Sequence, residues 1–243
     1  MTVGSTDSIA RYAYPGAELE LFQHAVNWKR YYAGEIRQYI NGDVLEVGAG
    51  IGATSRFLCD VRHSSWTCLE PDPALARRLL DDLATTRLPA PPVVREGTIR
   101  MLPPEASFDT ILYIDVLEHI DDDRGELRES AQRLRRGGYL IVLAPAHMWL
   151  FSPFDRAIGH FRRYTRRSLV AAGPAGLALV RAFYLDTVGM LASLGNRLVL
   201  RAAHPNARQI RFWDSRLVPA SRVVDRLTGR RAGKTVVAVW TKA

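Results

Sequence analysis

Cysteine and lysine are both scarce in this 243-residue sequence. The two cysteines, Cys59 and Cys68, stand at no metal-ligand spacing, so we expect reduced thiols in the core and no disulfide framework. Lysine occurs only at Lys29, Lys234 and Lys242, and arginine makes up the rest of the 33 basic residues. Such a bias mainly reflects the base composition of a genome. The net charge of +8 is therefore weak support for nucleic-acid binding.

Long uncharged apolar runs are also missing. The nearest candidate, from Leu177 to Val199, is interrupted by Arg181, Asp186 and Arg197, so we expect no membrane span. The first 16 residues contain no apolar segment of the kind found in signal peptides. We therefore expect a cytoplasmic protein, and the length favours one domain over residues 1–243.

Apolar strands alternate with amphipathic helices along most of the chain. Such alternation predicts an α/β fold, with a doubly wound and mostly parallel seven-stranded sheet. The expected strands are 44–47, 65–69, 93–95, 108–114, 139–143, 177–184 and 233–241, the last at the end of the sheet. The expected helices are 17–40, 53–61, 73–84, 123–134, 167–172, 190–203 and 214–227.

A glycine-rich loop leaves the first strand and enters a helix, with the sequence VLEVGAGIGA over residues 44–53. Glycine allows positive φ angles and close approach of a ligand. Gly48, Gly50 and Ala53 also fit a dinucleotide fingerprint, and a tight turn without any ligand is a third interpretation. Glu46 favours another cofactor, because a buried carboxylate here would repel a pyrophosphate and hold an ammonium group.

Four segments together resemble the class I S-adenosylmethionine-dependent methyltransferases, in that family's order and spacing. They are VLEVGAGIG (44–52), CLEPD (68–72), FDTILYIDVLEHI (108–120) and LRRGGYLIVLAP (134–145). The resemblance implies a Rossmann-like fold and S-adenosylmethionine as cofactor. It divides the domain into an N-terminal arm and helix (1–40), a cofactor-binding half (41–145), and a lid and substrate-side half (146–243) that begins with an insertion after the fifth strand.

The same resemblance implies the cofactor contacts. Glu46 and the glycine-loop backbone would hold the methionine part, Glu70 the ribose, and Thr98 with Ile99 the adenine. Thr98 departs from the acidic residue that the family often has near the adenine amine. The complete set of implied cofactor contacts is Glu46, Gly48, Ala49, Gly50, Gly52, Glu70, Pro71, Thr98, Ile99, Asp115 and Val116.

Residues 151–164 read FSPFDRAIGHFRRY, and this segment is similar to a signature of bacterial small-molecule methyltransferases. Ligands of open α/β sheets bind beyond the carboxyl ends of the strands, where this segment begins. We therefore predict His160 and Tyr164 as catalytic residues, and Asp155, Arg162 and Arg163 as substrate contacts. His119, in LEHI near the same cleft, is a third catalytic candidate, and Tyr14 of the N-terminal arm is a further substrate contact. The alternatives are an ion-paired, solvent-facing lid and a His119 that only packs or hydrogen-bonds locally.

The sequence predicts transfer of a methyl group to an oxygen or nitrogen of a small-molecule acceptor. The acceptor classes are acidic molecules and intermediates of secondary-metabolite, saccharide or lipid pathways. The six histidines form no close ligand motif, so we expect no metal, and we expect no nucleic-acid partner. A homodimer is compatible with the sequence. Alternative functions are a non-methylating protein with this cofactor fold, an NAD(P) oxidoreductase and a nucleic-acid methyltransferase.

Overall fold

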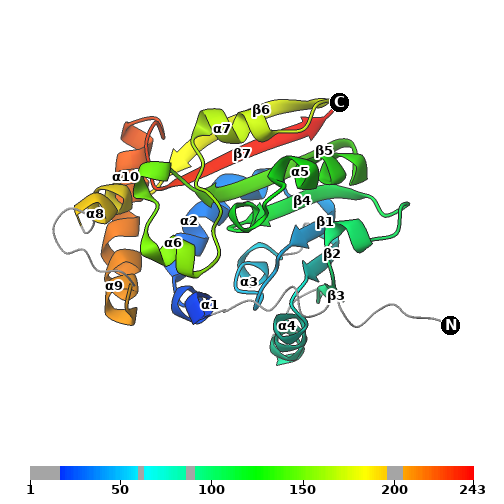
Figure 1. The fold of residues 1–243 in the computed structure, drawn as a ribbon, viewed down its shortest axis with the longest axis horizontal. Helices are drawn as coiled ribbons and strands as arrows, with labels where there is room; N and C mark the ends of the chain where they lie inside the picture. Colours follow the sequence, from blue (N-terminus) through cyan, green and yellow to red (C-terminus); the bar gives the residue numbers. More distant parts are fainter. Residues whose placement is uncertain (1–16, 60–62, 86–90, 196–204) are drawn as a thin grey trace.

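One seven-stranded sheet organises the chain, with the strand order β3-β2-β1-β4-β5-β7-β6. The computed structural model describes residues 17–59, 63–85, 91–195 and 205–243 (Figure 1). The strands are β1 (Gly42–Val47), β2 (His63–Glu70), β3 (Val93–Glu96), β4 (Phe108–Ile114), β5 (Leu134–Pro145), β6 (Leu177–Leu185) and β7 (Thr235–Lys242). Strands β1 to β5 pair in parallel, and β7 runs antiparallel to both β5 and β6. The predicted α/β fold with a mostly parallel sheet is confirmed.

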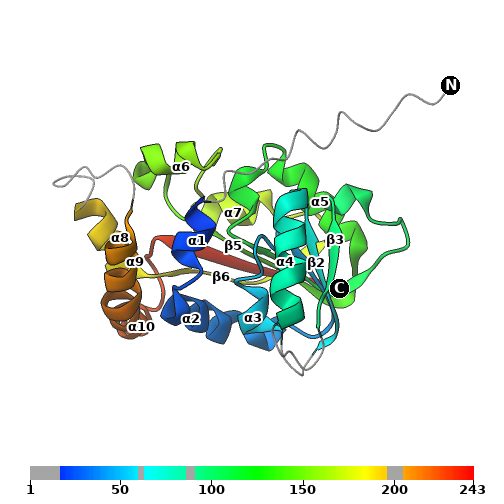
Figure 2. The same ribbon diagram turned by 90° about the horizontal axis from the view of Figure 1, so that it is seen from below.

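Helices cover both faces of the sheet (Figure 2). Helices α2 and α4 bury Tyr32, Ile36 and Leu79 on one face, and α5 and α7 bury Leu127 and Leu169 on the other. The described helices are α1 (Ala17–Phe22), α2 (Val26–Ile36), α3 (Ser55–Leu58), α4 (Pro73–Thr85), α5 (Asp123–Arg133), α6 (Pro153–Ala157), α7 (Arg166–Ala172), α8 (Thr187–Gly195), α9 (Ala207–Phe212) and α10 (Val218–Leu227). No helix among the described residues is long and apolar enough to cross a membrane.

Strand β7 does not lie at the end of the sheet, as the sequence suggested, but between β5 and β6. Residues 235–240 of β7 are all buried, without the alternation of a strand that has one wet face. A continuous apolar run of this kind suits a central strand with neighbours on both sides and helices on both faces. The edge position belongs to β6, whose first half is partly exposed.

Two helix predictions are also wrong at their boundaries. The single helix expected over 17–40 is divided into α1 and α2, and the Lys29 ammonium donates to the carbonyls of Phe22 and Gln23 where α1 ends. The helix expected from 214 begins earlier, since the Asn206 side chain caps α9, and a π-helical segment connects α9 to α10. The helix expected over 190–203 is α8 as far as Gly195, and the rest lies outside the described residues.

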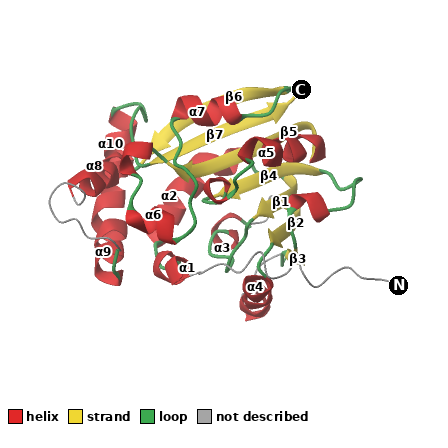
Figure 3. Cartoon of the chain, viewed as in Figure 1, coloured by secondary structure: helices red, strands yellow, loops and turns green. Residues whose placement is uncertain are grey.

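Helices α1, α6, α8 and α9 gather at the edge where the parallel strands end (Figures 1 and 3). Both the glycine loop after β1 and the segment after β5 begin at this edge. The fold therefore brings the two predicted functional regions to the same side of the sheet.

Candidate functional site

A cavity of about 820 Å³ opens at the carboxyl ends of the parallel strands. The glycine loop contributes Gly48, Ala49 and Gly50 to its wall, and Asp115 follows β4. Segment 151–164 and helices α1, α2, α8 and α9 contribute much of the remaining lining, which is mainly aromatic and aliphatic. This combination of apolar walls with a few convergent polar groups is typical of a small-molecule site.

The glycine loop has the backbone that its sequence predicts. Gly48 and Gly52 have φ angles of +66° and +71°. A Cβ atom at Gly48 would come within 2.7 Å of Val116, and one at Gly52 within 2.4 Å of Leu79. Larger residues are therefore excluded both by conformation and by space.

The amides of this loop are already paired. The N–H groups of Gly48 and Ala49 donate to the Leu69 carbonyl, at 2.7 and 3.2 Å. The Gly50 N–H donates to Glu70 Oε2 at 2.7 Å. A ligand can therefore approach the backbone of this loop closely, but these three N–H groups are not free to donate to it.

Glu46 is a buried carboxylate on β1, only 2% exposed. It accepts hydrogen bonds from the Ser55 hydroxyl (2.6 Å) and the Trp66 indole N–H (3.0 Å). Burial raises the pKa of Glu46 to about 7, against the smaller opposite effect of these bonds. No lysine or arginine within the described ranges forms an ion pair with it, so a cationic ligand group would complete its environment.

Glu70 ends β2 and accepts hydrogen bonds from the N–H groups of Gly50 and Asp72. It supports the glycine loop from behind and does not line the cavity. The cofactor-side residues that line the cavity are Glu46, Gly48, Ala49, Gly50 and Asp115. The cofactor-side residues outside the lining are Gly52, Glu70, Pro71, Thr98, Ile99 and Val116.

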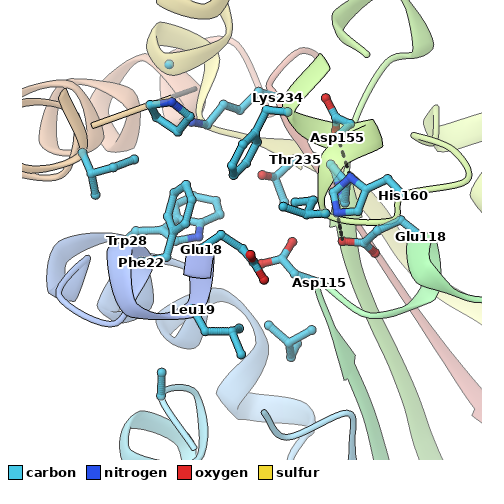
Figure 4. Close-up of a pocket in the computed structure, with 18 of the residues that line it drawn as sticks. Glu18, Leu19, Phe22, Trp28, Asp115, Glu118, Asp155, His160, Lys234 and Thr235 are labelled. Carbon is cyan, nitrogen blue, oxygen red and sulfur yellow. Dashed lines mark hydrogen bonds and ion pairs between the residues drawn. The ribbon is translucent and has the colours of Figure 1, made fainter. Parts of the chain in front are cut away.

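His160 lies between two carboxylates (Figure 4). Its Nδ1 is 2.9 Å from Asp155 Oδ1, and its Nε2 is 3.8 Å from Glu118 Oε1. The His119 ring meets the His160 ring edge-on, with 4.5 Å between the ring centroids. Burial lowers the pKa of His119 to about 4 and raises the pKa of Glu118.

Asp155 is held by a dense set of donors. It forms a capping box with Ser152 at the start of α6, and its two oxygens accept from Arg163 Nε (2.7 Å) and Nη2 (2.9 Å). Burial alone would raise the pKa of Asp155, but the hydrogen bonds from His160 and Arg163 lower it well below the usual range. Asp155 is therefore an ionised anchor that orients His160 and occupies Arg163.

Two predicted residues do not line the cavity, and a third cannot be placed. The Tyr164 hydroxyl donates to Asp123 (2.7 Å), and its ring is packed in the core, 3% exposed. Arg162 forms ion pairs with Asp121 and Asp123 outside the cavity lining. Tyr14 lies outside the described residues. The predicted catalytic and substrate residues that do line the cavity are His119, Asp155, His160 and Arg163.

Four charged cavity residues were missed from the sequence: Glu18, Lys29, Glu118 and Lys234. Lys29 is buried between α1 and α2, which lowers its pKa to about 8. The Lys234 ammonium is 3.4 Å from Asp186 Oδ2 and lies over the Trp213 ring. Lysine occurs at only three positions in the chain, but this rarity does not indicate that Lys29 and Lys234 lie in the cavity.

Known proteins share this architecture. Residues 45–142 match a family model described as a methyltransferase domain. A protein of Mycolicibacterium smegmatis named "Probable S-adenosylmethionine-dependent methyltransferase" is 30% identical over 156 residues, which are 63% of this chain and 56% of that protein. The chain thus spans little more than half the length of this relative.

Solved structures agree on the fold. Coclaurine N-methyltransferase, crystallised with N-methylheliamine and SAH, has a TM-score of 0.61 at 14% identity, covering 90% of this chain and 72% of that one. The [4+2]-cyclase SpnF has a TM-score of 0.60 at 15% identity, covering 93% and 95%. Residues 45–142 thus match a methyltransferase domain, and the solved structures share the fold of the chain.

Proposed function

We propose that this chain transfers the methyl group of S-adenosylmethionine to an oxygen or nitrogen atom of a small-molecule acceptor. The observation that carries the proposal is that one cavity joins the glycine loop and Glu46 to the buried cluster of Glu118, His119 and His160. The first group suits the cofactor and the second suits the polar end of an acceptor. The volume of about 820 Å³ lies within the usual range of ligand pockets.

The residues on the cofactor side fit S-adenosylmethionine. Gly48 and Gly52 form a cradle that side chains would fill, and Glu46 is a buried carboxylate without a lysine or arginine partner among the described residues. Glu46 would hold the ammonium group of the methionine part. The cofactor supplies a methyl group on a positively charged sulfur, ready for in-line displacement.

The protein's contribution is alignment and exclusion of water. Apolar cavity residues from several elements enclose the acceptor, among them Phe22, Trp28, Leu150, Phe154 and Ile210. Holding two reactants in line can supply roughly 7–11 kcal/mol of barrier lowering. We place the acceptor's reacting atom against His160, which Asp155 orients from the opposite side. No protein nucleophile is needed for such a reaction.

Ligand stabilisation tests the cofactor. We expect S-adenosylmethionine or its demethylated product, at 100 times its Kd, to raise the free energy of unfolding by about 2.7 kcal/mol. NADH and NADPH should leave the melting temperature unchanged, because the Glu46 carboxylate opposes a pyrophosphate in this loop. A thermal-shift titration checks this directly. Stabilisation by NADPH alone would overturn the assignment of the cofactor.

Cofactor affinity should depend on pH through Glu46. Because the pKa of Glu46 is about 7, its carboxyl group is mostly protonated at pH 6 and mostly ionised at pH 7.5. Only the ionised form can pair with the ammonium group of the cofactor. An α-amino group stays largely cationic over that range, so we expect affinity for the demethylated cofactor to rise about 5–10-fold. Glu46→Gln should bind weakly and show a much smaller rise. Calorimetry at a series of pH values measures both proteins, and equal slopes would exclude Glu46.

In the ligand-free protein, ionisation of Glu46 has the opposite effect, because it lowers the stability of the fold. Burial raises the pKa of Glu46 from 4.5 to about 7, so the folded state binds the proton more tightly than the unfolded state. This contribution to stability is present at low pH and is lost as the pH rises through about 7. Added cofactor should therefore protect the fold more at pH 7.5 than at pH 6.

The neighbour named as a cyclase shows that this fold does not fix the reaction. A non-methylating role would still give cofactor binding. Formation of the demethylated cofactor together with a methylated acceptor separates the two, and extracts fractionated by polarity offer an unbiased source of acceptors.

A further inference from the structure

Two imidazoles and a carboxylate meet at the polar end of the cavity. Donor atoms of Glu118, His119 and His160 all lie within 4.8 Å of one another. Glu118 and His119 belong to the 3₁₀ turn Leu117–His119 after β4, and His160 follows α6 after β5. Because β4 and β5 are neighbours in the sheet, the two segments converge although they are far apart in the sequence.

His160 is oriented as a metal ligand commonly is. Its Nδ1 is bonded to Asp155 Oδ1, so its Nε2 faces Glu118. Metal-binding histidines usually place their second nitrogen against a carboxylate or carbonyl, which fixes the tautomer and the ring. Asp155 is itself fixed by Arg163 and Ser152. The ring of His160 is therefore held in place before any ligand binds.

Glu118 supplies the second observation. It is 1% exposed, and its Oε2 has no hydrogen-bond partner in the part of the chain that the structure describes. A buried carboxylate oxygen without a partner is costly. The three cations that line the cavity have other partners: Arg163 is paired with Asp155, Lys234 with Asp186, and Lys29 donates to the carbonyls of Phe22 and Gln23. A bound cation at this point would remove the deficit.

We propose that Glu118, His119 and His160 bind a divalent transition-metal ion. Two imidazoles and one carboxylate are a ligand set suited to Zn²⁺ or Fe²⁺, and such sets leave open positions for a further ligand. The donors of a tetrahedral ion with bonds of about 2.1 Å lie roughly 3.4 Å apart. The three side chains, now within 4.8 Å, therefore draw together slightly on binding. This site replaces our expectation from the sequence that no metal is bound.

The site also narrows the acceptor class, a consequence that rests on the proposed function. An open position facing the cavity suits an acceptor with a hydroxyl group, whose pKa falls on binding the ion. The hydroxyl proton leaves to water. The oxygen lone pair then forms the bond to the methyl carbon, and the electron pair of the breaking carbon–sulfur bond stays on sulfur, which becomes a neutral thioether. Oxygen is therefore the methylated atom.

Metal binding can be measured without turnover. Full-length protein is stripped with a chelator and titrated with Zn²⁺ by calorimetry, and with Co²⁺ by visible absorption. We expect one ion per chain and ligand-field bands typical of bound Co²⁺. Glu118→Gln and His160→Gln should each weaken Zn²⁺ binding by at least about 10-fold, since loss of an outer-shell partner alone costs 10–100-fold.

His24→Gln is the matched control, because His24 is exposed and outside the cluster. It should bind Zn²⁺ like the unaltered chain, and melting curves confirm that all variants fold. Absence of stoichiometric binding in the folded parent protein, or equal binding in all three variants, would overturn the site whatever the methyl-transfer result. Stoichiometric binding in a protein that transfers no methyl group would uphold the site and remove the proposed function.

Discussion

Replacing His160 by alanine should slow methyl transfer by about 10²–10⁴-fold, the range expected when a group that assists proton loss is removed. His160 lines the cavity together with the glycine loop but contacts Asp155 and Glu118. The Kd of the demethylated cofactor should therefore stay nearly constant. The proposed metal site explains the slower methyl transfer of His160→Ala, because an ion held by fewer protein ligands would activate the acceptor less well.

Single-turnover methyl transfer is the decisive measurement, since it isolates the chemical step from product release. His24→Ala, an exposed histidine outside the cavity, should retain the full rate. If His160 only packs the segment after α6, its alanine variant will melt earlier and lose a little in every kinetic constant. A stable His160→Ala protein with a rate near that of the parent would exclude His160 from the reaction.

The geometry of the glycine loop could be predicted because its signal is local. Residues 44–53 contain a strand, a turn and the start of a helix, so Gly48 and Glu46 acquire their geometry within one short segment. The spacing of later motifs then follows from the alternation of strands and helices. Glu70 was predicted at the right end of β2, although its structural bonds to the loop amides depend on tertiary contacts.

The cluster of His119 and His160 could be predicted only in part, because sheet pairing creates it. His119 and His160 were singled out separately, but nothing in their sequence spacing indicated that their rings meet. Tyr164 shares a motif with His160, yet its hydroxyl donates to Asp123 and its side chain does not line the cavity. Glu18 reaches the cavity because the chain turns between α1 and α2, and the helical periodicity did not reveal that turn.

The position of β7 shows the same limit. Its apolar composition indicated a strand, but composition alone does not tell whether a strand at the chain's end joins an edge or inserts between two others. Insertion places Lys234 and Thr235, at the start of β7, on the cavity wall. Residues in the last tenth of the chain thus contribute to a site whose sequence motifs lie mostly in the first half.

Removing the charge of Asp155 should destabilise the fold strongly. Asp155 is 0% exposed, and Arg163, its bidentate partner, has a side chain only 15% exposed. Breaking a buried pair from one side typically costs 3–5 kcal/mol. We expect Asp155→Asn to lower the free energy of unfolding by about 3 kcal/mol, near the lower limit, because Arg163 keeps some contact with solvent and asparagine can still accept from Ser152.

Denaturant unfolding of the parent chain, the single variants Asp155→Asn, Arg163→Met and Glu20→Gln, and a double variant tests this expectation. Glu20→Gln is the control, because its ion pair with Arg78 is exposed and should be worth at most about 1 kcal/mol. In the double variant Asp155→Asn with Arg163→Met, neither member of the buried ion pair is left unpaired. Its loss of unfolding free energy should therefore be smaller than the sum of the losses of the two single variants. For a chain of this size, about 3 kcal/mol corresponds to a fall in Tm of roughly 6–12 °C. An Asp155→Asn protein as stable as Glu20→Gln would show that Asp155 is not the anchor of segment 151–164.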